Sequence, residues 1–200
     1  MSDDFPFPSE PTITVRDPLA EFLGAGKGYF TYTFADAVRL SGHACPTVAG
    51  AFLMVARALK LLYPDETPQR GDIEIIIPGL PDQGVNGPIS QVFTLVTGAA
   101  PETGFHGLSG RFVRKDLLRF DTEIMREGPW FRFRRRSNGQ TVALSYSPQV
   151  IPPAPEMAEA MGQALAGRAD AATLERFQTA WRQRVIAILA DAGQRTIRQR

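Results

Sequence analysis

The sequence predicts an α+β fold, in which a mixed or antiparallel sheet packs with a long helix and a helical hairpin follows at the C-terminal end. Three observations support this prediction. A long apolar run with helical spacing follows Pro46, a β-branched run closed by Pro-Gly occupies residues 72–79, and a Ser-Asn-Gly turn separates two strand-like runs within 129–147. The 200 residues suit one domain with a substantial core.

The chain begins with a segment, residues 1–18, that is rich in proline, aspartate and serine and is expected to be a loosely held arm. GAGKG at 24–28 has the composition of a phosphate-binding loop but lacks the required spacing, so we expect a flexible turn there. Residues 33–42 are expected to form a short helix that Thr33 caps and Gly42 ends.

The clearest helix begins at Pro46, because proline suits the first helical turn, where its missing N–H would have no partner anyway. It ends at Tyr63, and its apolar stripe consists of Val48, Phe52, Val55, Ala56, Leu59 and Leu62. The next predicted helix spans 85–98, opened by Asn86 and ended by Gly98.

The second half of the chain is expected to supply strands first. Residues 112–120 and 129–147 are predicted strands, and the second of these segments forms a hairpin because Asn-Gly tolerates positive φ. VIPPAPE at 150–156 can hold neither helix nor strand and is expected to be a linker.

Helical periodicity then covers residues 156–166 and 171–192. We therefore expect an α+β core over residues 1–150 and a C-terminal helical extension over 151–200.

Composition limits the classes of function. A net charge of +1 indicates no particular partner, and a single cysteine excludes an internal disulfide framework. The acidic start, MSDDFPFPSEP, lacks the basic and apolar regions of a signal peptide, and no stretch reaches the roughly 20 apolar residues of a membrane span. We therefore expect a cytoplasmic protein without membrane contact.

The segment SGHACPTVAG, residues 41–50, places His43 and Cys45 immediately ahead of the long helix. The unpaired N–H groups and the dipole of a helix start favour negative charge, so a thiolate at Cys45 would be stabilised there. A thiolate is both a nucleophile and a soft metal ligand, and the His43 imidazole could bind the same metal or pair with the sulfur. The alternative is that both are ordinary, half-buried side chains.

The second histidine, His106, lies in the glycine-flanked segment TGFHGLSG at 103–110. Two histidines and one cysteine form a suitable ligand set for catalytic zinc, which keeps a fourth position open for water. We therefore predict a metal site, with zinc as the metal, formed by His43, Cys45 and His106. The acids near the predicted strand, which could orient an imidazole or act as a base or simply face water, are Asp72, Glu74 and Asp82.

A basic segment extends from residue 111 to residue 136, with nine Lys or Arg against four acids. Together with Phe131 and Phe133 it could bind an anionic ligand or single-stranded nucleic acid. In the alternative, which we favour, the phenylalanines of an alternating strand face the core and the arginines face water. A nucleic-acid partner is accordingly not expected.

The pattern Gly42-His43-Ala44-Cys45-Pro46, followed by Gly50 and an alanine-rich helix with Arg57-Ala58-Leu59, resembles the FmdE-like family, which is named after a component of formylmethanofuran dehydrogenase. Members of that family carry G-H-x-C-P-G at the start of a long helix. Thr97-Gly98 and residues 104–108 are similar to a later Thr-Gly pair and a glycine-containing loop, so the resemblance covers residues 33–147. It implies an α+β core that forms a homodimer, with a metal-binding or otherwise functional cleft near His43 and Cys45.

The chain departs from the family pattern at two places. Thr47 stands where the family has glycine, and the cysteine and acid expected around residues 84–91 are absent, since Gln83, Asn86, Ser90 and Gln91 occupy that stretch. Three hypotheses follow: a metal-binding protein, with or without a metal-dependent activity; a metal-independent enzyme with Cys45 as nucleophile and His43 or His106 as base; and a ligand-binding or interaction module that uses the basic strands.

Overall fold

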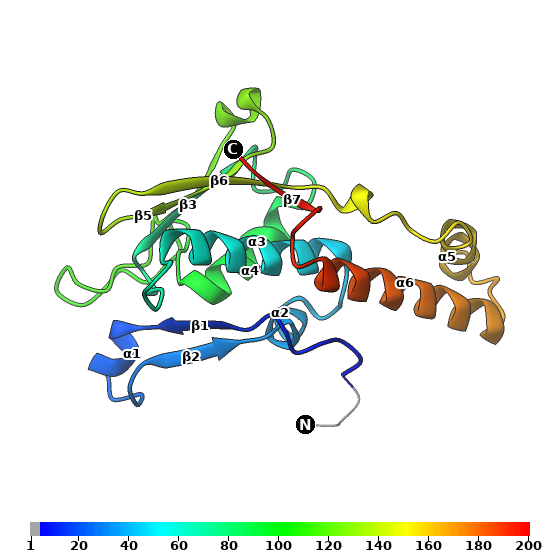
Figure 1. Cartoon of the computed structure of the whole chain (residues 1–200), viewed down its shortest axis with the longest axis horizontal. Helices are drawn as coiled ribbons and strands as arrows, with labels where there is room; N and C mark the ends of the chain where they lie inside the picture. The colour runs from blue at the N-terminus through cyan, green and yellow to red at the C-terminus, as the bar shows by residue number, and fades with distance from the viewer. Residues whose placement is uncertain (1–4) are drawn as a thin grey trace.

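The computed structural model describes residues 5–200 and confirms the α+β fold. The strands form one sheet of five and one of two. In Figure 1 the helices α3 (Pro46–Leu62) and α4 (Asn86–Thr97) lie between the large sheet and the small one. The other four residues, 1–4, belong to the expected N-terminal arm and lie outside the described part of the chain.

The large sheet is mixed. The strand over residues 73–78 pairs in parallel with the one over 118–121, and all other neighbouring strands pair antiparallel. In spatial order, its strands are β4 (Leu118–Asp121), β3 (Ile73–Pro78), β5 (Phe131–Arg135), β6 (Thr141–Tyr146) and β7 (Ile197–Gln199).

Side chains alternate across this sheet as a half-buried sheet requires. Ile73, Ile75 and Ile77 are buried against the helices, whereas Glu74 and Ile76 on the same strand face away and are partly exposed. On β5 the two phenylalanines are buried, and Arg132 and Arg134 point to the open face as predicted. Arg135 points to the helix side instead, where it donates to the Leu62 carbonyl at 3.2 Å.

Helices α3 and α4 have the predicted ends. Pro46 is in the first turn of α3, whose C-cap is Tyr63, and α4 ends at Gly98 in the left-handed conformation with a φ of 72°. Phe93 of α4 packs edge-on against the two core phenylalanines of β5. α4 begins at Asn86 as predicted, with Val85 in the N-cap position, and the Asn86 side chain bonds the preceding loop.

The prediction that residues 1–18 form a loosely held arm is wrong from Ile13 onward, where the chain forms regular structure. β1 (Ile13–Arg16) pairs antiparallel with β2 (Tyr29–Tyr32), and α1 (Pro18–Phe22) and the 24–28 turn join them. This ribbon was not predicted, because its strands are only four residues long. The predicted short helix is α2 (Phe34–Ser41), with a Thr33 N–H to Asp36 Oδ2 bond of 2.8 Å at its start.

A buried ion cluster fastens the ribbon to the core. Asp17 accepts hydrogen bonds from Arg70 Nε at 2.9 Å and from Arg114 Nη2 at 2.6 Å. Arg114 is 7% exposed, and burial lowers its pKa below the ordinary value although the Asp17 charge opposes the shift. Because a buried charge without a partner costs far more than a surface charge, this cluster makes the N-terminal ribbon part of the domain.

The predicted strand 112–120 is mostly wrong, since only β4 at its end pairs with the sheet and the residues before it form turns. Beyond β4, two single-turn 3-10 helices, η1 (Ile124–Glu127) and η2 (Pro148–Val150), flank the β5–β6 hairpin.

The C-terminal hairpin forms as predicted, with α5 (Met157–Leu165) and α6 (Ala171–Asp191) side by side (Figure 1). It is tied to the core more closely than an appended extension, since the last half of α6 packs on α3 and the chain then returns to the sheet as β7. No helix in the described part of the chain is long and apolar enough to cross a membrane.

Candidate functional site

Cys45 is the N-cap of α3. Its backbone is extended, with φ of −149° and ψ of 167°, and its sulfur accepts a hydrogen bond from the Val48 N–H at 3.4 Å. This is the position at which a helix start leaves N–H groups unpaired, so the side chain supplies one of the missing acceptors. The structure therefore confirms that Cys45 lies at the helix start and gives its half-buried side chain a capping role.

Two aromatic side chains from distant elements hold the turn that carries Cys45. Tyr146 of β6 donates its hydroxyl to the Pro46 carbonyl at 2.7 Å, and Trp181 of α6 donates its indole N–H to the Ala44 carbonyl at 2.8 Å. The Tyr146 ring lies against Gly50, where a Cβ atom would be 2.2 Å from it. Glycine at this position is required by that close approach.

A cleft of about 360 Å³ adjoins this turn. Thr47 of α3 forms one part of its wall, the loop and first turn of α4 form another, and Tyr146 closes the end beside α3. The cleft is therefore built from the segment that contains His43 and Cys45, residues 41–50, and from the segment around residues 84–91. Its remaining lining residues are Pro78, Gln83, Gly84, Val85, Asn86, Ile89, Met125, Pro129, Phe131, Pro148 and Gln149.

The loop before α4 is fixed by its own amide side chains. Asn86 donates through Nδ2 to the carbonyls of Pro78, at 2.8 Å, and Leu80, at 2.9 Å, while Gln83 Oε1 accepts from the Leu80 N–H at 3.1 Å. Gly79, with φ of 94°, allows the close approach, because a Cβ there would be 2.3 Å from Gln83 Oε1. The cleft wall at this side is consequently preformed.

The cleft is uncharged and mostly apolar. Among the described residues that line it there is no Asp, Glu, Lys or Arg. Burial raises the pKa of the Tyr146 hydroxyl well above its ordinary value, with Arg184 opposing and Cys45 adding to the rise. Tyr146 is therefore neutral at physiological pH. The Asn86 side chain, 9% exposed, uses its amide hydrogens on the loop, and its Oδ1 accepts no hydrogen bond from residues 5–200.

His43 lies beside the turn but does not join Cys45. It is exposed, and its Nδ1 is 2.9 Å from the Ser41 carbonyl oxygen of its own turn. Within the described chain no hydrogen bond links the imidazole to the Cys45 sulfur, whose one such partner is the Val48 N–H.

His106 is placed at the other end of α4. That helix starts at the cleft and its 12 residues extend it by about 18 Å. The loop after it is fixed by Arg114, whose N–H donates to the Phe105 carbonyl at 2.8 Å and whose carbonyl accepts from Ala100 at 3.0 Å. His106 is exposed on this loop. The structure thus does not bring His106 to His43 and Cys45.

The expected zinc ion needs several His, Cys, Asp or Glu side chains close together. Residues 5–200 contain no group of three or more His, Cys, Asp or Glu side chains that could hold a metal ion. The three-ligand set His43, Cys45 and His106 is therefore not assembled within the chain, and zinc stays a prediction.

The three acids near β3 are not among the described lining residues of the cleft. Asp72 accepts hydrogen bonds from Tyr63 and Ser137 at 2.7 Å each, so it joins the end of α3 to the β5–β6 turn. Glu74 pairs with Arg134 on the open sheet face, and Asp82 is exposed.

No model of a known protein family matches this chain, and a search of curated proteins gives no match either. The resemblance to the FmdE-like family therefore remains a hypothesis that rests on the Gly-His-Ala-Cys-Pro segment and the later Thr-Gly pair.

Several residues of the cleft were missed by the sequence analysis. Tyr146, Phe131 and Gln149 carry no motif and are remote in sequence from Cys45. The available signal was Gly50, since a glycine in the middle of a buried helix indicates that another group approaches its backbone closely.

Proposed function

We propose that the protein binds a small, uncharged organic molecule in the cleft between the starts of α3 and α4. The observation that supports this most strongly is that two segments far apart in sequence, around Thr47 and around Gln83–Asn86, form one preformed wall with no charged side chain among its described lining residues. Such a mainly apolar hollow with a few polar groups is typical of small-molecule sites.

The lining also supports a particular ligand chemistry. Ile89, Phe131 and Met125 offer an apolar surface of a size that suits a ring. Asn86 Oδ1 offers a free acceptor, so the ligand should carry an N–H or O–H donor. The starts of two helices border the cleft, and their dipoles favour an electron-rich atom of the ligand at that end.

Cys45 stabilises the helix start beside the cleft and does not line the cleft itself. Its sulfur bonds the helix start and is not among the described lining residues. A nucleophilic role for Cys45 with His43 as base is therefore less well supported than ligand binding, because the imidazole bonds Ser41 instead of the sulfur.

The proposal is tested with a set of neutral aromatic and heteroaromatic fragments, screened against the protein by saturation-transfer NMR. Thr47→Phe fills the cleft from the α3 side. Thr67→Phe places the same ring on an exposed site beyond the opposite end of α3 and is the matched control.

We expect fragments that bind the native chain and the Thr67→Phe control, and lose at least about tenfold in affinity with Thr47→Phe. If no fragment binds, or if both variants weaken binding alike, the cleft is not the ligand site.

Three expectations from the sequence stay predictions: zinc at His43 and Cys45, a homodimer, and a cytoplasmic location. The first is tested by metal analysis of protein purified without chelator. Zinc that is stoichiometric in the native chain and lost in Cys45→Ser would support it.

A further inference from the structure

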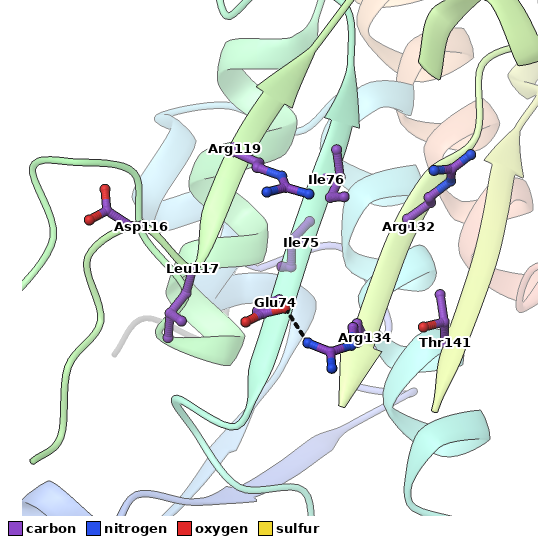
Figure 2. A pocket seen from close by; sticks show the side chains of 9 residues that line it. All are labelled: Glu74, Ile75, Ile76, Asp116, Leu117, Arg119, Arg132, Arg134 and Thr141. Atoms are coloured by element: carbon purple, nitrogen blue, oxygen red, sulfur yellow. Dashed lines mark hydrogen bonds and ion pairs between the residues drawn. The ribbon is translucent and has the colours of Figure 1, made fainter. Parts of the chain in front are cut away.

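The open face of the large sheet carries an arginine-lined hollow. Figure 2 shows Arg119 of β4, Ile76 and Glu74 of β3, and Arg132 and Arg134 of β5 around it. The hollow measures about 450 Å³ and lies on the sheet face opposite the helices, so it is separate from the cleft.

Strand register brings two of the arginines to either side of one apolar residue. Ile76 is the cross-strand partner of both Arg119 and Arg132. Adjacent strands are about 4.8 Å apart, so the two arginine backbones flank Ile76 at about 10 Å from each other. In Figure 2 the guanidinium of Arg119 extends over β3 toward Ile76. The guanidinium of Arg132 points away from Ile76 in the same view and pairs with Glu127 at 2.8 Å. One oxyanion placed above Ile76 therefore lies beside Arg119, and Arg132 reaches it from the other strand after a change of side-chain rotamer.

The charges on this face do not cancel. Glu74 pairs with Arg134 at 2.8 Å and with Arg136 at 3.6 Å, and Glu127 pairs with Arg132 at 2.8 Å and with Arg200 at 2.9 Å. Each of these carboxylates is thus shared by two guanidinium groups.

Among the remaining charged side chains of the hollow, one arginine has no carboxylate partner in residues 5–200. Asp116, at the edge of the hollow, pairs with Lys115 at 3.3 Å. The side chain of Arg119, which is exposed, makes no hydrogen bond or ion pair with any other residue in 5–200. Two carboxylates therefore serve four arginines, the third is paired with a lysine, and Arg119 has no carboxylate partner.

We propose that this hollow binds a small molecule through its phosphate group, with Arg119 as the principal ligand-binding residue and Arg132 as the second. Guanidinium groups donate pairs of parallel hydrogen bonds that match phosphate geometry. A phosphate has oxygens in several directions and can accept from guanidinium groups on two strands at once, whereas the two oxygens of a carboxylate lie in one plane.

Two other occupants fit the face less well. Single-stranded nucleic acid needs exposed aromatic rings on which bases stack, but Phe131 and Phe133 are buried on the opposite face at 7% and 0% exposure. A second copy of the chain would place one set of arginines against another, which costs free energy.

The test is calorimetric titration of the full chain with inorganic pyrophosphate at low ionic strength. Arg119→Gln removes the unpaired guanidinium, and because its side chain is exposed the variant should fold normally. Arg168→Gln, in the exposed turn between α5 and α6, removes the same charge elsewhere and is the matched control. A dT oligonucleotide and citrate are titrated in parallel.

We expect pyrophosphate binding that weakens at least about tenfold in Arg119→Gln and is unchanged in Arg168→Gln. Equal weakening in both variants would show a non-specific charge effect and overturn the proposal. Absence of binding at millimolar pyrophosphate would also overturn it, as would tighter binding of citrate or of the oligonucleotide. None of these results depends on the cleft at α3, so the two proposals fail separately.

Discussion

The two hollows of this domain differ in the charge of their lining, although β3 and β5 contribute to both. The cleft is bounded by helix starts and has no charged side chain among its described lining residues, whereas the hollow on the other sheet face is lined by three arginines. Side-chain alternation produces this difference, because consecutive residues of β5 face opposite sides of the sheet. One short strand, Phe131–Arg135, therefore supplies an apolar wall to one site and cations to the other.

The largest effect is expected from crowding the cleft side. Gly50→Ala places a Cβ 2.2 Å from the Tyr146 ring, so the ring must move or the helix must shift. We expect a loss of about 2–3 kcal/mol in the free energy of unfolding, with weaker fragment binding and unchanged pyrophosphate binding. Urea unfolding measures the first quantity.

The matched control is Gly162→Ala on α5, where a Cβ meets no atom within 4 Å. Its higher helix propensity should raise stability by up to about 1 kcal/mol. If Gly50→Ala were as harmless as this control, the close packing of Tyr146 on α3 would be wrong.

A somewhat smaller effect is expected at Asp191, the last residue of α6, ahead of the turn that leads to the edge strand β7. Burial raises the pKa of Asp191, but hydrogen bonds from Thr196 and Arg195 outweigh it and lower that pKa from 3.8 to about 2. The carboxylate therefore stabilises the turn before β7 fully above pH 3.8, and this stabilisation is lost as the pH falls through 2.

Asp191→Asn should consequently cost about 2 kcal/mol at neutral pH and flatten the acid limb of the stability curve. Thermal unfolding between neutral and acidic pH measures this. An acid limb that is the same in the native chain and the variant would contradict the role given to Asp191.

The Cys45 cap gives a third, smaller effect. Cys45→Ala removes the acceptor of the Val48 N–H and should cost about 1 kcal/mol, whereas Cys45→Ser keeps an acceptor and should cost less. Denaturant unfolding of both variants decides this. A Cys45→Ser protein that is stable but no longer binds fragments would instead indicate that the thiol acts directly on the ligand.

The smallest effect on stability is expected from a substitution of Glu127. The same substitution should change pyrophosphate binding. This exposed carboxylate has its pKa lowered by hydrogen bonds from Arg132 and Arg200. Glu127→Gln releases both guanidinium groups, so pyrophosphate affinity should rise about threefold while the unfolding midpoint stays unchanged. Calorimetry measures the affinity, and a fall in affinity would mean that Glu127 orients Arg132 for the ligand.

Local chemistry in the sequence predicted most of the fold. Pro46 and Gly98 marked the start of one buried helix and the end of another, and the Asn-Gly turn marked the β5–β6 hairpin, because such residues determine backbone conformation on their own. The ribbon β1–β2 and strand β7 were missed. Each has only three or four residues, too few for an alternating pattern, and they are held by long-range pairs such as Asp17 with Arg114.

The candidate site was predictable only in part. The sequence identified the turn at His43 and Cys45, since a helix start is a local feature. It could not show that Tyr146 and Trp181 hold that turn, because these contacts join residues 100 and 137 positions apart. It also grouped His106 with the other two from residue type alone, whereas the length of α4 separates them.

The central claim is that the neutral cleft and the arginine hollow are separate sites with opposite ligand preference, and amide chemical-shift mapping on ¹⁵N-labelled protein tests it most directly. A bound neutral fragment should shift the amides of Thr47, Asn86 and Tyr146, and pyrophosphate should shift those of Ile76, Arg119 and Arg132. Shifts from both ligands at the same residues, or from neither at these positions, would contradict the claim.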